Sequence, residues 1–379
     1  MVTVLVPAHN EAAFIARKIA DSLAQDYPAD RLEILVVDDG SADGTAEQAA
    51  RCGDPRVRVV QQSERQGKSA ALNRGVREAR GEIVVCTDAN GSLAPASVRA
   101  VVAAFDHPDV AVVSGRKLPI GDGAHGGGES AYWRYESALK GFEGRLGTVV
   151  GADGGIFAVR RSLFRDIPPG IFADDFWIPI DALSRGYRVR QANDACAFER
   201  TSKSKRDDFE RRQRIAAGIW QVSLRHLHLA DPRRGWTAVA FTWHRLMRSI
   251  AVPIALPVIL VTSWLSARSG NRVSRALLAA QAAAYTAAAA GAMANAKPFA
   301  VPYQFAMSNV AALGGGYRHL TRRQTGLWKQ TARGDWHPAA PGVEPGAGEP
   351  AIAMTAHSDP EPTPGAPRLP RQSTRDLAG

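Results

Sequence analysis

The residues best suited to chemistry come directly after apolar runs. Asp88 and Asn90 follow the run at residues 82–87. Their carboxylate and amide oxygens are ligands that a hard divalent cation prefers. Such a cation neutralises a diphosphate leaving group and acts as a Lewis acid. An ordinary turn is the alternative interpretation, because the sequence Asp-x-Asn is common in turns.

A second acidic pair, Asp38 and Asp39, follows the apolar run at residues 32–37 and precedes a Gly-Ser turn. Ligands of open α/β sheets bind outside the carboxyl ends of the strands. Carboxylates there accept hydrogen bonds from a base or a ribose. A helix N-cap followed by a tight turn is the structural alternative. Because Asp88 also ends a strand, we expect both acidic pairs at the same edge of the sheet.

Two helix starts supply the remaining candidates. Lys68 follows a Gln-Gly turn and leads into a helical pattern, where a lysine contacts phosphate oxygens. Asp174 and Asp175 open a later helix, and one of them suits a general base beside an acceptor hydroxyl. The structural alternatives are a solvated basic helix start for Lys68 and helix capping for the two acids.

The elements that position these residues alternate between short β-branched runs and helical patterns up to about residue 230. This alternation predicts an α/β fold with a mostly parallel sheet. The run at 32–37 is apolar on both faces, so it should be a central strand. The glycine-rich residues 121–128 predict a mobile loop. We expect strands at 2–7, 32–37, 56–61, 82–87, 110–114 and 157–160, and helices at 11–25 (capped by Asn10), 129–142 and 173–186.

The pattern changes near Trp243. Residues 250–267 are almost uncharged and about long enough to cross a bilayer. Residues 276–296 form a second uncharged stretch, for which a buried soluble helix is the alternative. We predict two membrane spans, with a third apolar segment, 299–313, lying in the interface and ending at a run of three glycines. Trp243, Arg245 and Arg248 should then lie at the head-group level.

The region between the two predicted spans does not fit this topology well, because it holds Arg268, Arg272 and Arg275. The chain from about Gly334 is rich in Pro, Gly and charge, which predicts a disordered tail. No signal peptide is expected, because Met1 runs straight into the first strand.

The composition of the chain indicates which classes of molecule it binds. The 379 residues carry a net charge of +10, which favours polyanions such as phosphorylated substrates and anionic lipids. Nucleic acid is not expected, because no aromatic residues interleave with the basic ones. Three scattered cysteines, Cys52, Cys86 and Cys196, predict a reducing compartment.

Together these residues resemble the family 2 glycosyltransferases, specifically the membrane branch that includes cellulose, hyaluronan and poly-N-acetylglucosamine synthases. The resemblance covers about residues 2–333. The ordered motifs that carry it lie at residues 6–11, 37–41, 67–73, 88–90, 151–155 and 174–175, and at Trp328.

The resemblance implies a GT-A catalytic domain at residues 1–235, a membrane-associated helical region at 236–333 and a tail at 334–379. It implies an inverting transfer from a UDP-sugar with Mg²⁺ or Mn²⁺ bound by Asp88 and Asn90. Asp175 matches the catalytic base of the family, because its separation in sequence from Gly186 agrees with the family's spacing between the acid and a glycine. The residues implied around the nucleotide and donor are Pro7, Asn10, Glu11, Asp38, Asp39 (near the uracil), Lys68 and Asp88, and those implied in the acceptor region are Asp153, Gly154, Asp174 and Arg214.

The sequence departs from the family pattern at two places. The synthases carry Gln-x-x-Arg-Trp after the base, and the aligned residues 211–215 keep only Arg214. This difference argues against a processive synthase. Asn90 stands where the metal motif usually ends in Asp, so we expect weaker metal binding.

The resemblance predicts an enzyme of cell-envelope or extracellular polysaccharide synthesis that acts on a glycan acceptor. We expect it at the inner membrane, in contact with lipids, with a cytoplasmic catalytic domain and no obligate protein partner. One alternative is transfer to a lipid-linked acceptor, a polyprenyl phosphate. Another is a non-catalytic, membrane-anchored nucleotide-sugar binding protein, against which the intact Asp39, Asp88 and Asp175 argue.

Overall fold

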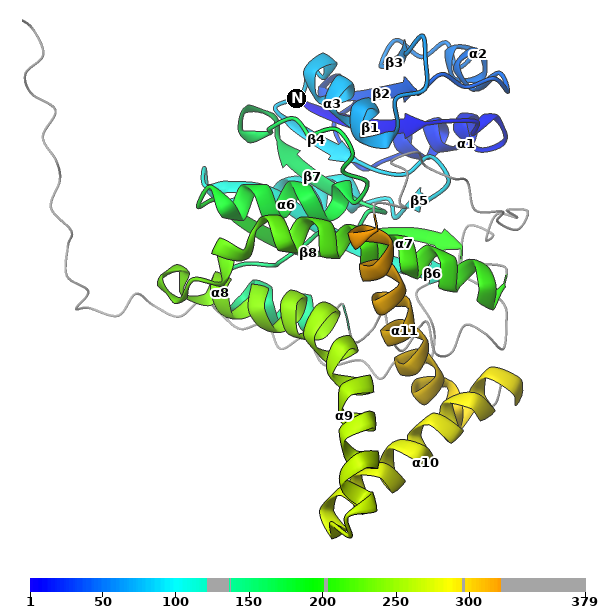
Figure 1. Cartoon of the computed structure of the whole chain (residues 1–379). Helices are drawn as coiled ribbons and strands as arrows, with labels where there is room; N and C mark the ends of the chain where they lie inside the picture. Colours follow the sequence, from blue (N-terminus) through cyan, green and yellow to red (C-terminus); the bar gives the residue numbers. More distant parts are fainter. Residues whose placement is uncertain (121–135, 137, 201–203, 295–296, 322–379) are drawn as a thin grey trace, which may run out of the picture. The chain divides into compact units, whose positions relative to one another are not determined.

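A computed structural model describes residues 1–120, 136, 138–200, 204–294 and 297–321 (Figure 1). The predicted glycine-rich loop, the predicted tail and Trp328 lie outside these residues. The helix predicted at 129–142 lies mostly outside them as well, although residues 138–145 are helical.

The sheet has eight strands in the order β3-β2-β1-β4-β7-β6-β8-β5, which confirms the α/β fold. The first four positions are parallel, whereas β7 is antiparallel to both of its neighbours and β5 is antiparallel to β8. The strands are β1 (Val2–Ala8), β2 (Leu32–Asp38), β3 (Val57–Gln61), β4 (Ile83–Cys86), β5 (Ser92–Leu93), β6 (Val110–Ile120), β7 (Phe157–Arg160) and β8 (Arg188–Arg200).

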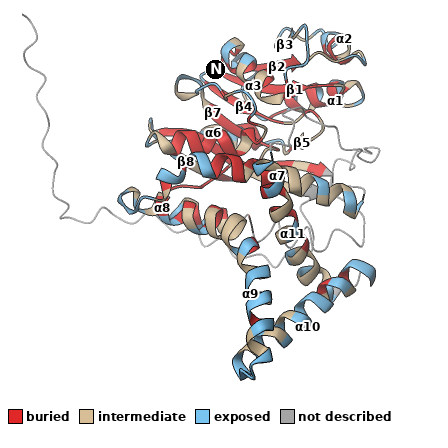
Figure 2. Ribbon diagram, in the orientation of Figure 1, coloured by how far each residue is buried: buried red, intermediate tan, exposed pale blue. Residues whose placement is uncertain are grey.

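Burial explains why the parallel half of the sheet was predictable. Every residue of β1 and β2 is buried, so both faces of these strands must be apolar (Figure 2). Two apolar clusters, one on each face, form the core. The helices near this sheet are α1 (Ala12–Leu23), α2 (Thr45–Ala50), α3 (Lys68–Glu78), α4 (Ser97–Ala103) and α6 (Asp174–Ser184).

The predicted cap of the first helix is wrong. Glu11 occupies the N-cap position of α1 without a capping bond from its own side chain, and the Asp43 carboxylate accepts a hydrogen bond from the first helical amide, that of Ala12, at 3.0 Å. Asn10 adopts a positive φ of 54°, and its Oδ1 accepts a hydrogen bond from the amide of Ala42 at 2.9 Å. The side chain therefore ties the loop after β1 to the loop after β2.

The chain after β8 is helical. First come α7 (Lys205–Arg225) and α8 (Trp236–Ala240). A π-helical segment, η5 (Phe241–Ala251), then joins α8 to α9 (Val252–Arg268). The chain continues with α10 (Arg272–Ala294) and α11 (Ala300–Leu320). In Figure 1, α9 and α10 lead away from the sheet, and α11 returns to lie along α7.

The close packing of α11 on α7 explains the run of three glycines. The three glycines predicted to end the third apolar segment lie inside α11. A Cβ at Gly315 would lie 2.6 Å from the amide nitrogen of Ala217, and one at Gly316 would lie 2.7 Å from the Trp220 ring. These glycines therefore permit helix contact and do not break the helix.

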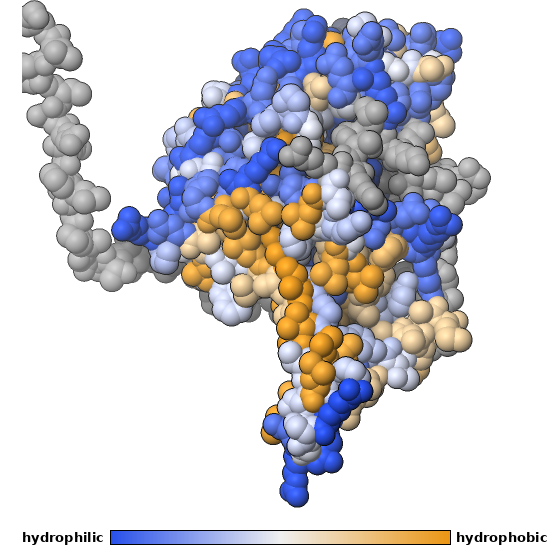
Figure 3. Space-filling model, in the orientation of Figure 1, coloured by the Kyte–Doolittle hydropathy of each residue, from blue (hydrophilic) through white to orange (hydrophobic). Residues whose placement is uncertain are grey.

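Two helical stretches, Trp236–Arg268 and Arg272–Met293, are long and apolar enough to cross a membrane. The first contains the predicted span 250–267, and the second covers residues 276–293 of the predicted span 276–296. Only 11% of the most apolar part of each is buried, and apolar side chains gather along α9 in Figure 3. Length and composition alone make these helices candidate spans, so their crossing of a membrane stays a prediction.

Candidate active site

The loop after β2 organises the turn that leads to Lys68. Asp39 is buried, and its carboxylate accepts hydrogen bonds from the amides of Gln66 (2.7 Å) and Gly67 (2.8 Å) and from Nε2 of Gln62 (2.9 Å). Asp39 therefore fixes the start of α3 in this structure. Its contact with a nucleotide base stays a prediction.

Four more of the residues predicted near the nucleotide lie at the ends of β1 and β2 or directly after them. Asp38 is fully buried and accepts hydrogen bonds from the amide and hydroxyl of Ser41. Glu11 is also buried, and its amide donates to Thr45 Oγ1 at 2.9 Å. Together with Asn10, these contacts bind the two loops to one another. Pro7 lies in β1 beside Val37 of β2.

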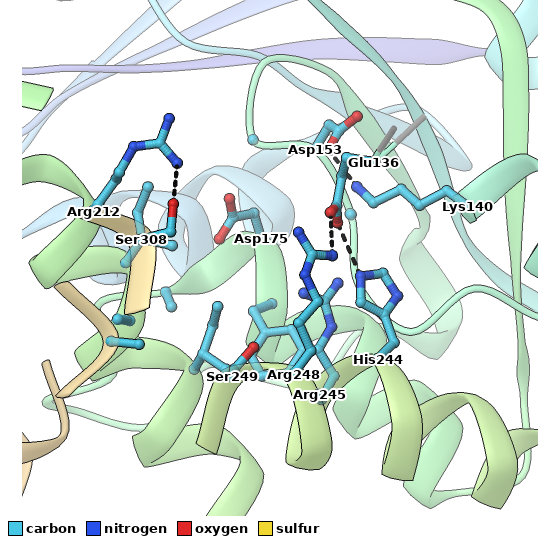
Figure 4. Close-up of a pocket in the computed structure, with 18 of the residues that line it drawn as sticks. Glu136, Lys140, Asp153, Asp175, Arg212, His244, Arg245, Arg248, Ser249 and Ser308 are labelled. Atoms are coloured by element: carbon cyan, nitrogen blue, oxygen red, sulfur yellow. Dashed lines mark hydrogen bonds and ion pairs between the residues drawn. The ribbon is translucent and has the colours of Figure 1, made fainter. Parts of the chain in front are cut away.

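A cavity of about 1210 Å³ lies in the part of the chain from Lys68 onward, and the residues of these two loops are not among those that line it (Figure 4). Its lining comes from the start of α3, the turn after β4, the start of α6, and the helices α7, η5, α9 and α11. It brings together eight of the predicted site residues: Lys68, Asp88, Asn90, Asp153, Gly154, Asp174, Asp175 and Arg214.

Lys68 joins two of the predicted acids. Its Nζ lies 3.0 Å from Oδ1 of Asp88 and 3.1 Å from Oδ2 of Asp174. Burial alone would lower the pKa of Lys68, but the carboxylates of Asp174 and Asp88 outweigh it and raise the pKa above its usual value. The lysine is therefore a fixed cation at the end of the cavity nearest the predicted donor site.

Asp175 is the acid with the properties of a base. Its carboxylate faces the cavity (Figure 4). Burial and the neighbouring charge of Asp174 raise the pKa of Asp175 from 3.8 to about 6. A pKa near neutrality suits a general base. Asp174, by contrast, is held by Lys68. The geometry supports the choice of Asp175 over Asp174.

The segment at residues 150–155 packs tightly against Asp175. The amide of Ala152 donates to the backbone carbonyl of Asp175 at 3.0 Å. A Cβ at Gly154 would lie 2.9 Å from the Asp175 carboxylate, so only glycine leaves this carboxylate in place. Asp153 forms an ion pair with the buried Lys140, which fixes the segment from the other side.

The turn at residues 88–90 fits a divalent cation. The Oδ1 atom of Asn90 is buried and has no hydrogen-bond partner among the described residues, although a buried oxygen normally has one. No group of three His, Cys, Asp or Glu side chains within the described residues could hold a metal by itself. Mg²⁺ and similar ions are commonly held by one or two carboxylates together with substrate phosphates. Asp88 and Asn90 match that arrangement.

The structure corrects the predicted place of Arg245 and Arg248. Arg245 is 8% exposed, and its Nε donates to the carbonyl of Val150 at 2.6 Å. Arg248 pairs with Glu136 at 2.6 Å. Only Trp243, which is 68% exposed, lies where a lipid head group could contact it. The turn of η5 directs the arginines towards the catalytic domain and the tryptophan away from it.

Sequence reasoning missed a buried polar cluster in this cavity. One ring nitrogen of His244 lies 3.0 Å from Glu136 (Figure 4), and the other lies 2.6 Å from Glu143. The partners are about 100 residues apart in sequence, so no local pattern could reveal them.

The aligned residues of the incomplete family motif lie on α7. Arg211 and Arg212 both pair with Asp208, at 3.1 and 2.9 Å. Arg214 lines the cavity, and its place in an acceptor region stays a prediction.

Comparison with known proteins identifies the class. Residues 3–168 match the sequence model described as Glycosyl transferase family 2. A mannosyltransferase, PcManGT from Pyrobaculum calidifontis in complex with GDP-Man and Mn²⁺, has a similar structure. Its TM-score is 0.66 at 28% identity, over 85% of this chain and 88% of that one. The matched segment, residues 3–168, is therefore a family 2 glycosyltransferase domain, and the fold is GT-A.

Curated relatives are similar over shorter segments. The succinoglycan biosynthesis protein ExoO of Rhizobium meliloti is 35% identical over 126 residues, which are 31% of this chain and 36% of ExoO. The probable glycosyltransferase YdaM of Bacillus subtilis is 26% identical over 243 residues, which are 60% of this chain and 57% of YdaM. The matches thus span about a third to just over half of these relatives.

Proposed function

We propose that this chain transfers a sugar from a UDP-sugar to an acceptor hydroxyl, or to an acceptor phosphate oxygen, with inversion at the anomeric carbon. The observation that carries the proposal is the arrangement of Asp175. It faces a large cavity whose donor side holds Lys68, Asp88 and Asn90. Its raised pKa leaves it largely ionised at pH 7 and still basic enough to accept a proton.

The residues divide the reaction between them. The acceptor oxygen gives its proton, where it has one, to the Asp175 carboxylate and forms a bond to the anomeric carbon. The bond from that carbon to the diphosphate breaks, and the nucleoside diphosphate leaves with the electron pair. Attack in line with the departing group inverts the carbon. Lys68 offers a fixed positive charge to the diphosphate.

A divalent cation held by Asp88 and Asn90 would neutralise the leaving diphosphate. The residues fit Mg²⁺ or Mn²⁺, and PcManGT was solved with Mn²⁺. The metal site is supported by the buried Oδ1 of Asn90, which has no hydrogen-bond partner among the described residues.

The identity of the nucleotide rests on the family resemblance and on Asp39. PcManGT holds GDP-Man, so a guanosine donor is the specific alternative to UDP. The donor test should therefore include both nucleotides.

The acceptor is proposed to be a glycan of envelope or extracellular polysaccharide synthesis, and ExoO, a succinoglycan biosynthesis protein, supports that choice. A second candidate has a specific observation in its favour. Val252 and Pro253 of α9, and Val301 and Phe305 of α11, line the far end of the cavity. An acceptor with an apolar tail, such as a polyprenyl phosphate, could lie there with its phosphate near Arg248.

We further propose that α9 and α10 anchor the chain in the inner membrane with the catalytic domain in the cytoplasm. Eleven exposed large apolar side chains on these two helices support the proposal, because outside a membrane they would be in contact with water. They are Val252, Ile254, Val258, Ile259, Val261, Trp264, Leu265, Val273, Leu277, Tyr285 and Met293.

The proposal is tested with purified protein in detergent. A panel of UDP-sugars and GDP-mannose is offered with Mn²⁺ or EDTA, and with either an oligosaccharide or a polyprenyl phosphate as acceptor. We expect metal-dependent release of one nucleoside diphosphate, accelerated by one acceptor class. Tight nucleotide binding without any turnover would instead support the non-catalytic binding protein.

A further inference from the structure

Arg245 connects the helix that leads into the apolar region with the base. It lies on η5, directly before α9. A buried guanidinium is costly unless it is paired and hydrogen-bonded, so its contacts indicate what it holds. Those contacts are made on both sides of Asp175.

The first contact is with the segment that packs on the base. Arg245 Nε donates to the carbonyl of Val150 at 2.6 Å. Gly151, the next residue, has a φ of 132°, and a Cβ there would lie 2.4 Å from a terminal nitrogen of Arg245. The amide of Ala152 then bonds to the carbonyl of Asp175 itself. One hydrogen-bonded path therefore runs from Arg245 to the backbone of the base.

The second contact is with the helix that carries the base. The Arg245 guanidinium lies 4.8 Å from the centre of the Phe176 ring, the residue after Asp175. A guanidinium stacks on an aromatic face and still donates hydrogen bonds in its own plane. Lysine has no planar group, so it cannot make both contacts at once.

Neighbouring polar contacts fix η5 in place. Burial alone would raise the pKa of Glu136, but contacts with His244, Arg248 and Arg245 lower it well below its usual value. Glu136 therefore stays charged and holds η5 against the catalytic domain. His244 adds its contact with Glu143.

We infer that Arg245 is a positioning residue that holds the base Asp175 at its working position from the helix preceding the apolar region. The inference rests on the proposed function. It also means that a displacement of η5 would misplace the base. A displacement of about 1 Å costs about 10²-fold in rate.

Two substitutions separate position from charge. Arg245→Met removes both contacts, and Arg245→Lys keeps the charge but not the planar group. We expect kcat for transfer to fall about 10²-fold in Arg245→Met, with KM for the donor within about threefold of wild type. Arg245→Lys should recover less than a tenth of the lost rate. Arg233→Met, at an exposed arginine shortly before η5, is the matched control and should behave as wild type.

A third substitution applies if Arg245→Met does not fold, as judged by its melting temperature. Phe176→Leu removes the ring and leaves the bond to Val150. It should lower kcat about tenfold at unchanged donor KM. Unchanged kcat in Arg245→Met, full recovery in Arg245→Lys, or unchanged kcat in Phe176→Leu would overturn the inference. A wild-type protein that is inactive on every donor would overturn the proposed function as well. If the wild type is active and the variants do not behave as expected, only the role of Arg245 is overturned.

Discussion

The ammonium nitrogen of Lys68 lies 3.0 Å from Oδ1 of Asp88, at the turn where the buried Oδ1 of Asn90 has no hydrogen-bond partner within the described part of the chain. The buried Lys18 fixes this turn, because its Nζ donates hydrogen bonds to Oγ1 of Thr87 and to the carbonyl of Gly91. We expect Asp88→Ala to abolish transfer, with a loss of about 3 kcal/mol or more in transition-state stabilisation. Steady-state rates with Mn²⁺ measure it.

Asn90 offers the matched comparison. Asn90→Asp adds a carboxylate ligand, so it should bind Mn²⁺ more tightly than wild type, and Asn90→Ala more weakly. Titration of Mn²⁺ in the presence of nucleoside diphosphate gives the three affinities. Full activity of the wild type in EDTA would contradict the metal assignment.

The close approach of Gly154 to the base gives a prediction independent of charge. A Cβ at this position would lie 2.9 Å from Oδ2 of Asp175 and would have to displace that carboxylate. Gly154→Ala should therefore lower kcat by at least about tenfold. Gly141→Ala is the control, because its Cβ would meet no atom closer than 4.0 Å. Equal rates in the two variants would show that the carboxylate moves freely.

The parts of the fold set by short-range pattern were predictable, and those set by distant partners were not. The runs at 2–7 and 32–37 are buried on both faces, so composition alone revealed them. The long strand β8 was missed, because its residues alternate with charges and it is defined by pairing with β6 across about 80 residues.

The same division holds in the site. Asp88, Asn90 and Asp175 were predictable because each follows a strand or starts a helix. Arg245 was predicted at a membrane surface, since a local sequence shows a basic residue beside an apolar run and does not show Val150, 95 residues away.

The raised pKa of Asp175 predicts a stability cost. Between the unfolded value of 3.8 and the folded value of about 6, the folded chain holds a proton that the unfolded chain has lost. Stability therefore falls as pH rises through this window, and the cost is complete above pH 6. A rise of two pKa units corresponds to about 3 kcal/mol of unfolding free energy. Contact of the Asp175 carboxylate with water in the cavity reduces this cost. The free energy of unfolding of Asp175→Asn should therefore exceed that of the wild type by about 1–2 kcal/mol at pH 7.

Denaturant unfolding at two pH values measures this gain. At about pH 3.5 the wild-type carboxyl is protonated in the folded state and about two-thirds protonated in the unfolded state, so the advantage of Asp175→Asn should shrink to a few tenths of a kcal/mol or less. An equal gain at both pH values would contradict a raised pKa in the folded state.

Membrane association is predicted from α9 and α10. The full chain should stay in membranes washed with carbonate. Replacing the exposed Val258 and Val261 by Asp should release it, because a charge at the centre of a span costs about 2.5–3.5 kcal/mol. Fractionation of cells expressing both forms is the measurement. Release of the unmodified chain by the wash would mean that these helices are peripheral.

The choice between the two adjacent acids tests the account most directly. The measurement is single-turnover transfer by Asp175→Asn and Asp174→Asn, together with the Kd of each for nucleoside diphosphate. We predict that Asp175→Asn loses at least about 10² in rate with unchanged Kd, because the base faces the acceptor. The wild-type rate should itself fall as pH drops below about 6. A crippled Asp174→Asn beside a mild Asp175→Asn would contradict the account.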